Sequence, residues 1–272
     1  MTNLISRNNP KIKQIHKLLS QRKQRHSSGL FVVEGIRHVG EACAAHADVD
    51  YICYAPDLLT SDYAHQLVQE QSGLGIPCIP VDKGTFTSLA SKDNPPGILA
   101  VVRQPRMQLE SLSIENFKWG VALVAPQDPG NIGSILRTID AVGANGLLLL
   151  DDPANSQFSA DPYHPSAVRA SMGAIFWHPI VSTTFSSFVQ WDRFREYHVY
   201  GTSAHATEDY RTLERYETPM ILLMGSEREG LTPSQSAVCE AMLSLPMRGR
   251  VTSLNLAVAA GVVLYKMMSE VS

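Results

Sequence analysis

The sequence predicts an α/β protein of two domains, the second of which is built on a doubly wound parallel sheet. Strand-like and helix-like segments alternate along the chain, which is the pattern of α/β domains. The pattern restarts at VALVA (121–125), a wholly apolar run that is typical of a strand buried on both faces. A polar loop, an amphipathic helix and a second apolar run, GLLLL (146–150), follow and complete a β–loop–α–β unit.

The N-terminal third of the chain predicts a smaller α/β domain. Its expected strands are LFVVEG (30–35), DYICYAP (50–56), PCIPVD (77–82) and ILAVVRQP (98–105), with helical segments between them. Residues 103–118 are polar, contain a proline and lack a strong period. We therefore expect a first domain over residues 1–102, a linker over 103–118 and a second domain over 119–272.

The start of the chain is strongly basic, although the whole protein has a net charge of −3. Between Met1 and Gly29 there is no acidic residue, and the basic ones are Arg7, Lys11, Lys13, Lys17, Arg22, Lys23 and Arg25. An apolar stripe made by Ile12, Ile15, Leu18 and Leu19 predicts an amphipathic helix here. On charge alone, a solvated helix face and a phosphate-binding surface are equally compatible with this pattern.

Capping signals frame the helices of the second half. Asn131 and Gly143 stand where the N-cap and the C′ residue of the helix after VALVA are expected. Thr232, Pro233 and Gln235 predict a capping box with proline at N1. A last helix is expected from Asn255, and it is apolar on nearly every side. Such a helix is buried either in the core or against a second subunit.

Loops that follow parallel strands meet at the carboxyl edge of the sheet, where ligands bind. The first such loop, PQDPGN (126–131), lacks a GxGxxG pattern, so a dinucleotide is not favoured. Arg137, in the following helix, lies off the apolar face, and both a surface position and an anion-binding role stay open. A later loop, LPMRGRVTSLN (245–255), sets Arg248 and Arg250 before Ser253 and Asn255, two short polar side chains that are expected to share one site.

The remaining loop, GSEREGLT (225–232), has nearly the glycine spacing of a phosphate-binding P-loop. The lysine of that motif is missing, and Glu227 and Glu229 would repel phosphate oxygens. This loop therefore favours a ligand that is neutral or cationic at its reactive end.

Composition narrows the class of protein. The chain has 272 residues, of which 44% are hydrophobic, yet no apolar run is long enough to span a membrane. The polar N-terminus does not resemble a signal peptide, and four separated cysteines without a CxxC pair predict reduced thiols. We therefore expect a cytoplasmic protein with no structural metal site.

The three loops together, in this order, resemble the SpoU/TrmH family of the SPOUT class of S-adenosylmethionine-dependent RNA methyltransferases. The resemblance runs from NIGSILR through GSEREGL to LPMRGRVTSLNLAVAAGVVLY, roughly residues 121–268. DPYHPSAVRASMGAIF (161–176) fits the segment that follows the first motif. SRNNPKIKQIHKLLSQRKQR, followed by GLFVVEGIRHVGEA, resembles the family's substrate-binding domain.

This resemblance implies a C-terminal SPOUT, Rossmann-like parallel sheet with a deep trefoil knot, and a ribosomal-protein-like N-terminal α/β domain. It also implies a homodimer through the last helix and methyl transfer to a ribose 2′-hydroxyl, with rRNA favoured over tRNA. A non-catalytic RNA-binding or ribosome-assembly protein on the same fold is the alternative. A Rossmann oxidoreductase is disfavoured because GxGxxG is absent.

The resemblance assigns roles by position. The implied binding residues for S-adenosylmethionine are Thr202, Gly225, Leu245 and Leu254. The implied catalytic residues are Asn131, Arg137, Glu227, Ser253 and Asn255. Because a guanidinium hardly ever deprotonates, we expect Arg137 to orient the substrate and stabilise charge instead of acting as a base. The expected RNA-binding residues are Arg7, Lys11, Lys13, Arg22, Lys23, Arg25 and Arg169.

Overall fold

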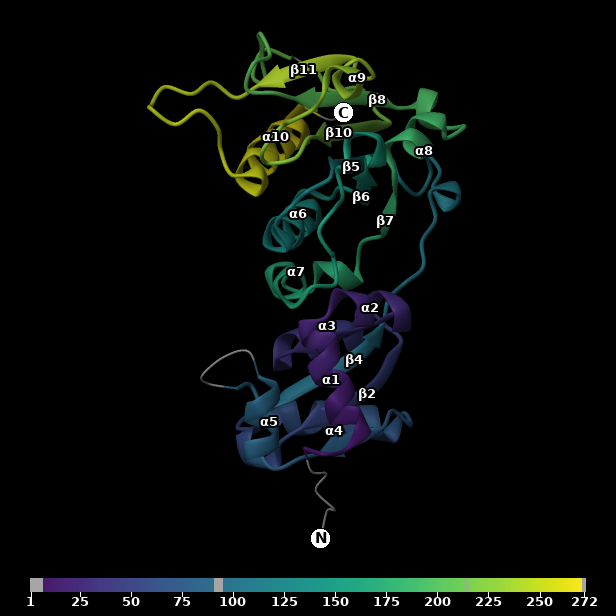
Figure 1. The fold of residues 1–272 in the computed structure, drawn as a ribbon, viewed down its shortest axis with the longest axis vertical. Coiled ribbons are helices and arrows are strands. Elements are labelled where there is room, and N and C mark those ends of the chain that lie inside the picture. The colour runs from purple at the N-terminus through teal and green to yellow at the C-terminus, as the bar shows by residue number, and fades with distance from the viewer. Residues whose placement is uncertain (1–6, 91–94, 214, 271–272) are drawn as a thin grey trace. The chain divides into compact units, whose positions relative to one another are not determined.

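The computed structural model describes residues 7–90, 95–213 and 215–270, and the chain divides into two compact units (Figure 1). The first unit contains Met1–Pro105 and Tyr163–Phe176, and the second contains Arg106–Pro162 and Trp177–Ser272. Tyr163–Phe176, which was expected in the second domain, therefore belongs with the first unit. The reason is aromatic packing, since the rings of Tyr163 and Phe176 lie 4.8 and 6.2 Å from that of Phe31, between ring centroids.

The first unit is a mixed sheet with helices packed on it. Its strands are β1 (Leu30–Glu34), β2 (Val49–Tyr54), β3 (Cys78–Pro80) and β4 (Ile98–Arg103). They run in the order β1-β4-β2-β3, with β4 antiparallel to β1 and β2, while β2 and β3 are parallel. The helices are α1 (Pro10–Ser20), α2 (Arg22–Ser28), α3 (Ile36–Ala44), α4 (Asp62–Gly73), α5 (Lys83–Leu89) and α7 (Pro165–Ala170).

Helix α1 is the amphipathic helix that the sequence predicts. Asn9 caps it by accepting a hydrogen bond from the Lys11 N–H at 2.9 Å, and Pro10 occupies the first turn. The apolar stripe is fully buried at Ile12, Ile15 and Leu18. Burial of this face leaves Lys13 and Lys17 exposed on the opposite side.

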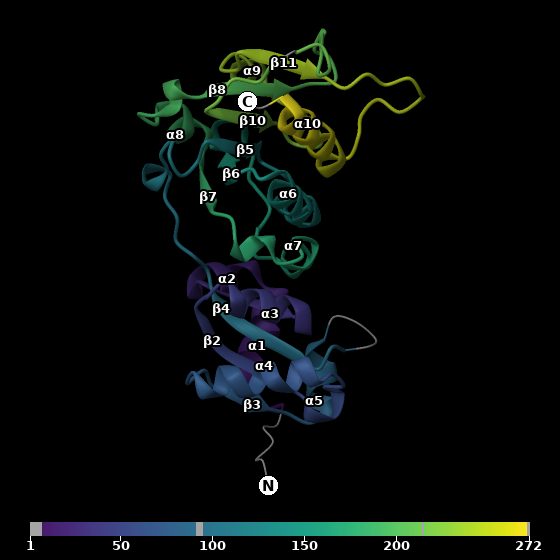
Figure 2. The same ribbon diagram turned by 180° about the vertical axis from the view of Figure 1, so that it is seen from behind.

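The second unit is built on a parallel sheet whose described strands run in the order β7-β6-β5-β10-β8-β11-β9 (Figures 1 and 2). The strands are β5 (Trp119–Val124), β6 (Gly146–Asp151), β7 (Ile180–Thr184), β8 (His198–Thr202), β9 (Glu208–Asp209), β10 (Met220–Met224) and β11 (Ala241–Ser244). The helices are α6 (Pro129–Val142), α8 (Phe185–Gln190), α9 (Pro233–Ser236) and α10 (Leu256–Glu270). The predicted parallel sheet is confirmed.

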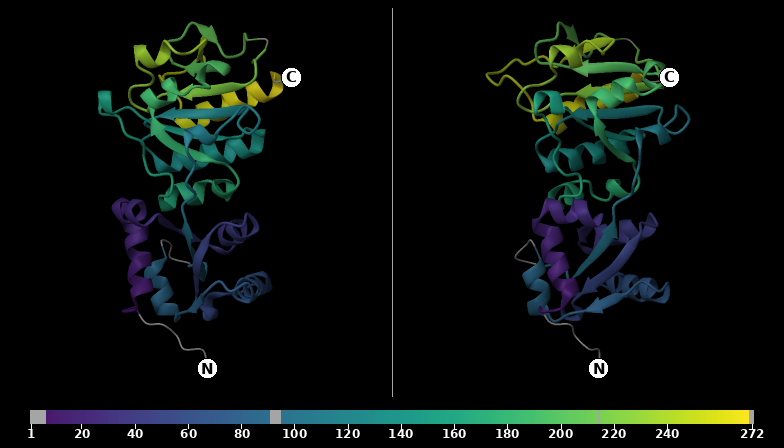
Figure 3. Two further views of the ribbon diagram at one scale, coloured as in Figure 1. Left: turned by 90° about the vertical axis from the view of Figure 1, so that its right-hand side faces the viewer. Right: turned by 45° about the vertical axis from the view of Figure 1, so that its right-hand side comes forward.

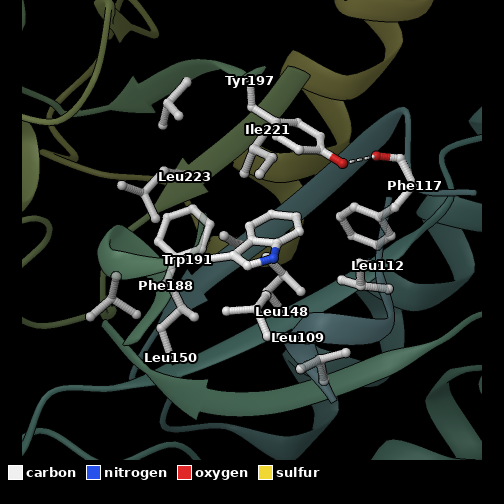
Figure 4. Close-up of a cluster of buried hydrophobic side chains, with 14 of the residues drawn as sticks. Leu109, Leu112, Phe117, Leu148, Leu150, Phe188, Trp191, Tyr197, Ile221 and Leu223 are labelled. Atoms are coloured by element: carbon white, nitrogen blue, oxygen red, sulfur yellow. Dashed lines mark hydrogen bonds between the residues drawn. The ribbon is translucent and has the colours of Figure 1, made fainter. Parts of the chain in front are cut away.

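Both faces of this sheet are covered. Helix α10 packs beside α6 on one face, and α8 lies on the other (Figures 1 and 3). Alternation along β6 explains this, because successive side chains of a strand point to opposite faces. Leu148 and Leu150 join a core cluster with Phe188 and Trp191 beneath α8 (Figure 4). In the same cluster Tyr197 donates a hydrogen bond to the Phe117 carbonyl at 2.7 Å.

Two local expectations differ from the structure. The residues after Pro105, expected as a polar linker, contribute Leu109, Leu112 and Phe117 to the buried core of the second unit. Their apolar side chains are too widely spaced to give a period, so the sequence pattern hid them. Helix α6 is capped by Asp128, with Pro129 at N1, so the expected N-cap Asn131 lies inside the helix.

The other capping signals are confirmed. Gly143 ends α6 in the left-handed conformation at φ +76°, where a side chain would be strained. Thr232 and Gln235 form the capping box of α9, with Pro233 at N1. The capping box at Thr232 therefore ends the carboxyl-edge loop that follows β10.

Candidate functional site

A pocket of about 340 Å³ lies at the carboxyl edge of the sheet in the second unit. Its walls come from the segments that follow β8, β10 and β11, three neighbouring parallel strands, and from the start of α10. It is lined by the four residues expected to bind the methyl donor, Thr202, Gly225, Leu245 and Leu254. Glu227 and Ser253, expected to be catalytic, line it as well. Six residues proposed from separate motifs therefore share one pocket.

Gly225 is required by close packing of the backbone. The turn after β10 closes on itself, with the Gly230 N–H donating to the Ser226 carbonyl at 3.0 Å. A Cβ at position 225 would overlap the backbone of Gly230 and Leu231, which cannot move away as a side chain could. Gly230 has φ +66°, which also favours glycine. The two glycines of GSEREG thus make a compact turn instead of a phosphate cradle.

Glu227 joins this turn to the loop after β5. Its Oε2 accepts a hydrogen bond from the Gln127 N–H at 2.9 Å, and its Oε1 accepts from the Asn131 amide at 2.9 Å. The Asp128 N–H donates to Oε1 at 3.3 Å. Burial raises the pKa of this carboxyl, but the hydrogen bonds from Gln127 and Asn131 outweigh it and leave the pKa below its usual value. Glu227 is therefore held as a carboxylate.

Asn131 and Asn255 extend the connection to the third loop. The Asn255 amide donates to Asn131 Oδ1 at 2.9 Å, while Asn255 Oδ1 accepts from the Ala257 N–H at 2.9 Å at the start of α10. Asn131 is buried, and both ends of its amide are occupied by Glu227 and Asn255. Side chains from three distant segments of the chain thus form one connected network. These hydrogen bonds hold the three segments in fixed positions relative to one another.

A second polar network, which the sequence did not predict, includes Glu229, which lines the pocket. Gln157 Nε2 donates to Glu229 at 2.5 Å, and Gln235 Nε2 donates to Asp152 at 2.7 Å. Gln235 is fully buried, and Asp152 and Gln157 are nearly so. Glu229 is thus tied to the segment after β6, while Glu227 is tied to the one after β5. Only the capping box at Gln235 gave a signal for this network.

Arg137 stands apart from the pocket. It lies two turns into α6, is exposed, and is absent from the pocket lining. The guanidinium makes no hydrogen bond or ion pair with another residue in the described part of the chain.

The pocket lining also includes Ser203, Ala204 and His205, which follow β8 and carry no motif that the sequence could have revealed.

The basic residues proposed for RNA binding have different environments in the first unit. Lys13, Arg22 and Lys23 are exposed, whereas Arg7 donates to the Gly84 carbonyl at 2.8 Å and Lys11 lies 4.3 Å from the centre of the Tyr51 ring. Arg169, in α7, is half-buried, and its carbonyl contacts His38 Nε2 at 3.3 Å.

Arg25 corrects one prediction. Its side chain is only 2% exposed, and its guanidinium donates to the Leu18 carbonyl at 2.6 Å, at the end of α1. A guanidinium used in this way holds the two N-terminal helices together and is not presented to phosphate. In the sequence, Arg25 is one of several closely spaced basic residues, and nothing in that pattern distinguishes it from its exposed neighbours.

Among residues 7–90, 95–213 and 215–270, no cluster of three or more His, Cys, Asp or Glu side chains could hold a metal ion. No helix within those ranges is long and apolar enough to cross a membrane.

Two family models match the chain, and together they cover most of it. Residues 118–265 match the SpoU rRNA Methylase family, and residues 9–100 match the MRM3-like substrate binding domain. These ranges correspond to most of the second unit and most of the first.

Similar proteins cover the chain over nearly its whole length. The 23S rRNA (uridine(2479)-2′-O)-methyltransferase of Streptomyces viridochromogenes is 31% identical, covering 98% of this chain and 92% of that protein. The 23S rRNA (guanosine(2553)-2′-O)-methyltransferase RlmP of Bacillus subtilis is 27% identical, covering 97% and 98%. The AdoMet-bound rRNA methyltransferase of Sinorhizobium meliloti is 30% identical, with a TM-score of 0.85 over 99% of this chain and 97% of that one.

Proposed function

The chain belongs to the SpoU rRNA methylase family, and we propose that it transfers a methyl group from S-adenosylmethionine to a ribose 2′-hydroxyl of 23S ribosomal RNA. The observation that carries this proposal is a single pocket. It is lined by Thr202, Gly225, Leu245 and Leu254, and its lining residue Glu227 belongs to the hydrogen-bond network with Asn131 and Asn255. We propose that this methylation of ribosomal RNA takes place in the cytoplasm.

S-adenosylmethionine, when bound, supplies an electrophilic methyl group on a sulfonium cation. Glu227 lines the pocket as a fixed carboxylate, so its charge favours a cation there. The same hydrogen bonds make it a poor general base, because its oxygens are occupied and its pKa is lowered. Its role is to hold the loops and the local field, so that proximity between hydroxyl and methyl group provides most of the acceleration.

Arg137 is proposed to orient the RNA near the 2′-hydroxyl. A guanidinium suits a phosphate because it can donate two parallel hydrogen bonds. Arg137 is exposed and lies outside the pocket lining of its own chain, so we propose that it acts on the RNA backbone and not on the methyl donor. Ser253, which lines the pocket, is the candidate for contact with the target nucleotide.

A homodimer is part of the proposal. Val258, Tyr265 and Met268 are 52%, 51% and 43% exposed and recur at helical spacing on the outer face of α10. Leu256 and Ala259, on the same helix, line the pocket. An apolar helix face this close to the site suits a second copy of the chain. Light scattering should give a dimer mass for the wild type and a monomer mass for Tyr265→Asp.

A deep trefoil knot is proposed for the segment from β10 to α10. It is supported by the return of α10 to α6 after the chain has passed through β11, three strands away from β5 in the sheet. An experimental structure in which α10 does not pass through the loop made by the preceding segments would contradict this proposal.

The central experiment measures where the methyl group goes. The full chain is incubated with isotopically labelled S-adenosylmethionine and unmodified 23S rRNA, and the labelled nucleosides are identified by mass spectrometry. The proposal requires label on ribose. Label on a base would contradict the ribose assignment, and RNA binding without donor binding would favour a non-catalytic RNA-binding protein. Arg137→Ala should abolish the ribose label while leaving donor binding intact.

A further inference from the structure

Phe158 is an exposed aromatic side chain at the edge of the sheet where the site lies. It follows β6, the strand next to β5, and is 54% exposed although its neighbours Gln157 and Ser159 are buried. The other exposed aromatic side chains lie elsewhere. Tyr63 is on α4 of the first unit, Trp177 precedes the amino end of β7, and Tyr265 is on the outer face of α10. Position therefore distinguishes Phe158 from ordinary exposed apolar residues.

The backbone around Phe158 is fixed on both sides. Gln127 Nε2 donates to the Phe158 carbonyl at 2.9 Å, and the Ser159 N–H donates to Asp151 Oδ1 at 2.7 Å. The Ala160 N–H donates to the Pro126 carbonyl at 2.7 Å. These hydrogen bonds order the backbone that carries the ring, so the segment itself needs no ordering when a ligand stacks on the ring, and this lowers the entropic cost of binding.

One residue separates Phe158 from the catalytic network. Gln127, whose side chain holds the Phe158 carbonyl, donates its own backbone N–H to Glu227 at 2.9 Å. Glu227 lines the pocket and binds Asn131. Phe158 is thus positioned by the same loop that the network holds. Its ring has no aromatic partner within the described residues.

We infer that Phe158 is a stacking platform for an unpaired base of the RNA substrate, next to the ribose that is methylated. The inference rests on the proposed function. Sequence-specific RNA binding proteins mostly recognise single-stranded nucleotides, whose bases stack on aromatic side chains. A base that is already unpaired next to the target ribose presents an open face on which an aromatic ring can stack. An exposed phenyl ring beside the network supplies the surface that such a displaced base needs.

The test compares Phe158→Ala, Phe158→Leu and Phe158→Tyr in the full chain, with 23S rRNA transcribed in vitro as substrate. Loss of the ring should raise the KM for RNA roughly tenfold or more in the alanine and leucine variants. Tyrosine, which keeps the ring, should restore the KM to near the wild-type value. The kcat at saturating RNA and the Kd for S-adenosylmethionine, measured by calorimetry without RNA, should stay unchanged.

A second measurement reports the contact directly. Ultraviolet irradiation of the wild-type complex, followed by mass spectrometry, should find Phe158 crosslinked to a nucleotide adjacent to the methylated one. A leucine variant with a wild-type KM would overturn the inference, as would a crosslink far from the methylated nucleotide. A change in oligomeric mass for Phe158→Ala would also overturn it, because it would assign the ring to a subunit contact. If the wild type methylates no ribose, the proposed function fails, whereas the crosslink still decides whether Phe158 stacks on RNA.

Discussion

Lys13, Arg22 and Lys23 in the first unit and Glu227 in the second unit use their charges in opposite ways. In the first unit Lys13, Arg22 and Lys23 are exposed on helices and make no ion pair with another described residue. In the second unit the oxygens of Glu227 accept hydrogen bonds from fixed donors, although the residue is exposed. Unpaired exposed charges act over several ångströms and are screened by salt, whereas a carboxylate held by hydrogen bonds acts through geometry. Substitutions in the two units should therefore change different measurable quantities.

Among the substitutions that test this comparison between the two units, the largest effect is expected from Glu227→Ala. It leaves the N–H groups of Gln127 and Asp128 without their acceptor and frees the turn after β10. A misplacement of about 1 Å at the site can cost about 100-fold in rate, so we expect kcat/KM to fall by about that factor. Steady-state methylation assays on rRNA would measure it. Glu110→Ala, at an exposed glutamate, should behave as wild type; equal losses in both variants would show that the network has no special role.

Arg25→Ala should affect stability more than RNA binding. It removes a buried guanidinium and leaves the Leu18 carbonyl without that donor, which should cost roughly 2–4 kcal/mol of unfolding free energy. Chemical denaturation would measure the loss. Arg22→Ala, three residues earlier and exposed, is the matched control and should leave the midpoint unchanged. A stable Arg25→Ala protein with weakened RNA binding would return this residue to the phosphate-binding set.

Asn255→Ala should have an intermediate effect on the second unit. Asn255 Oδ1 accepts from the N–H groups of Ala257 and Val258, so the substitution removes a helix cap worth about 1 kcal/mol. It also leaves Asn131 Oδ1 without its donor, and a several-fold rise in the Kd for S-adenosylmethionine should follow. Calorimetry would measure the Kd. Asn255→Ser, which keeps a capping oxygen, should recover helix stability but not the link to Asn131.

Neutralising the exposed charges of the first unit should have a smaller effect, and one that depends on salt. Lys13→Gln, Arg22→Gln and Lys23→Gln should each weaken RNA binding and reduce the slope of log K against log salt by about 0.7 to 0.9. Filter binding at several salt concentrations would measure both quantities. The same substitutions should leave donor affinity unchanged, and a salt slope equal to that of the wild type would remove these residues from the RNA surface.

The smallest expected effect is the pH dependence that Glu227 contributes to stability. Its pKa is lower in the folded protein than in the unfolded chain, so its contribution is present above the ordinary glutamate pKa. This contribution is lost as the pH falls through the lowered folded-state value. The difference in unfolding free energy between the wild type and Glu227→Gln should therefore be constant near neutral pH and shrink below about pH 4.5. A difference that persists in strong acid would exclude this linkage.

The sequence predicted the parallel sheet and the pocket because both depend on local patterns. Apolar runs mark buried strands, and short polar loops after them, such as GSEREG, converge at one edge whatever their separation in the chain. No local sequence pattern shows which side chains form hydrogen bonds with each other. The hydrogen bond between Gln157 and Glu229 joins residues 72 positions apart, and neither residue type at its position signals the other. Arg25 was predicted to bind RNA because its burial could not be predicted either, since burial of a basic residue depends on how α1 and α2 pack.

The segment Tyr163–Phe176 has a consequence for anyone who would divide or recombine this protein. Although it lies deep within the C-terminal half of the gene, its aromatic rings complete the packing around Phe31. If the chain were cut after Pro105, the N-terminal fragment would lack part of its hydrophobic core. The C-terminal fragment would carry residues 163–176 without the aromatic ring of Phe31 against which they pack. Chimeras that exchange the substrate-binding domain between relatives should therefore exchange residues 163–176 with it. In this protein the module that can be exchanged between relatives therefore consists of two separate stretches of sequence.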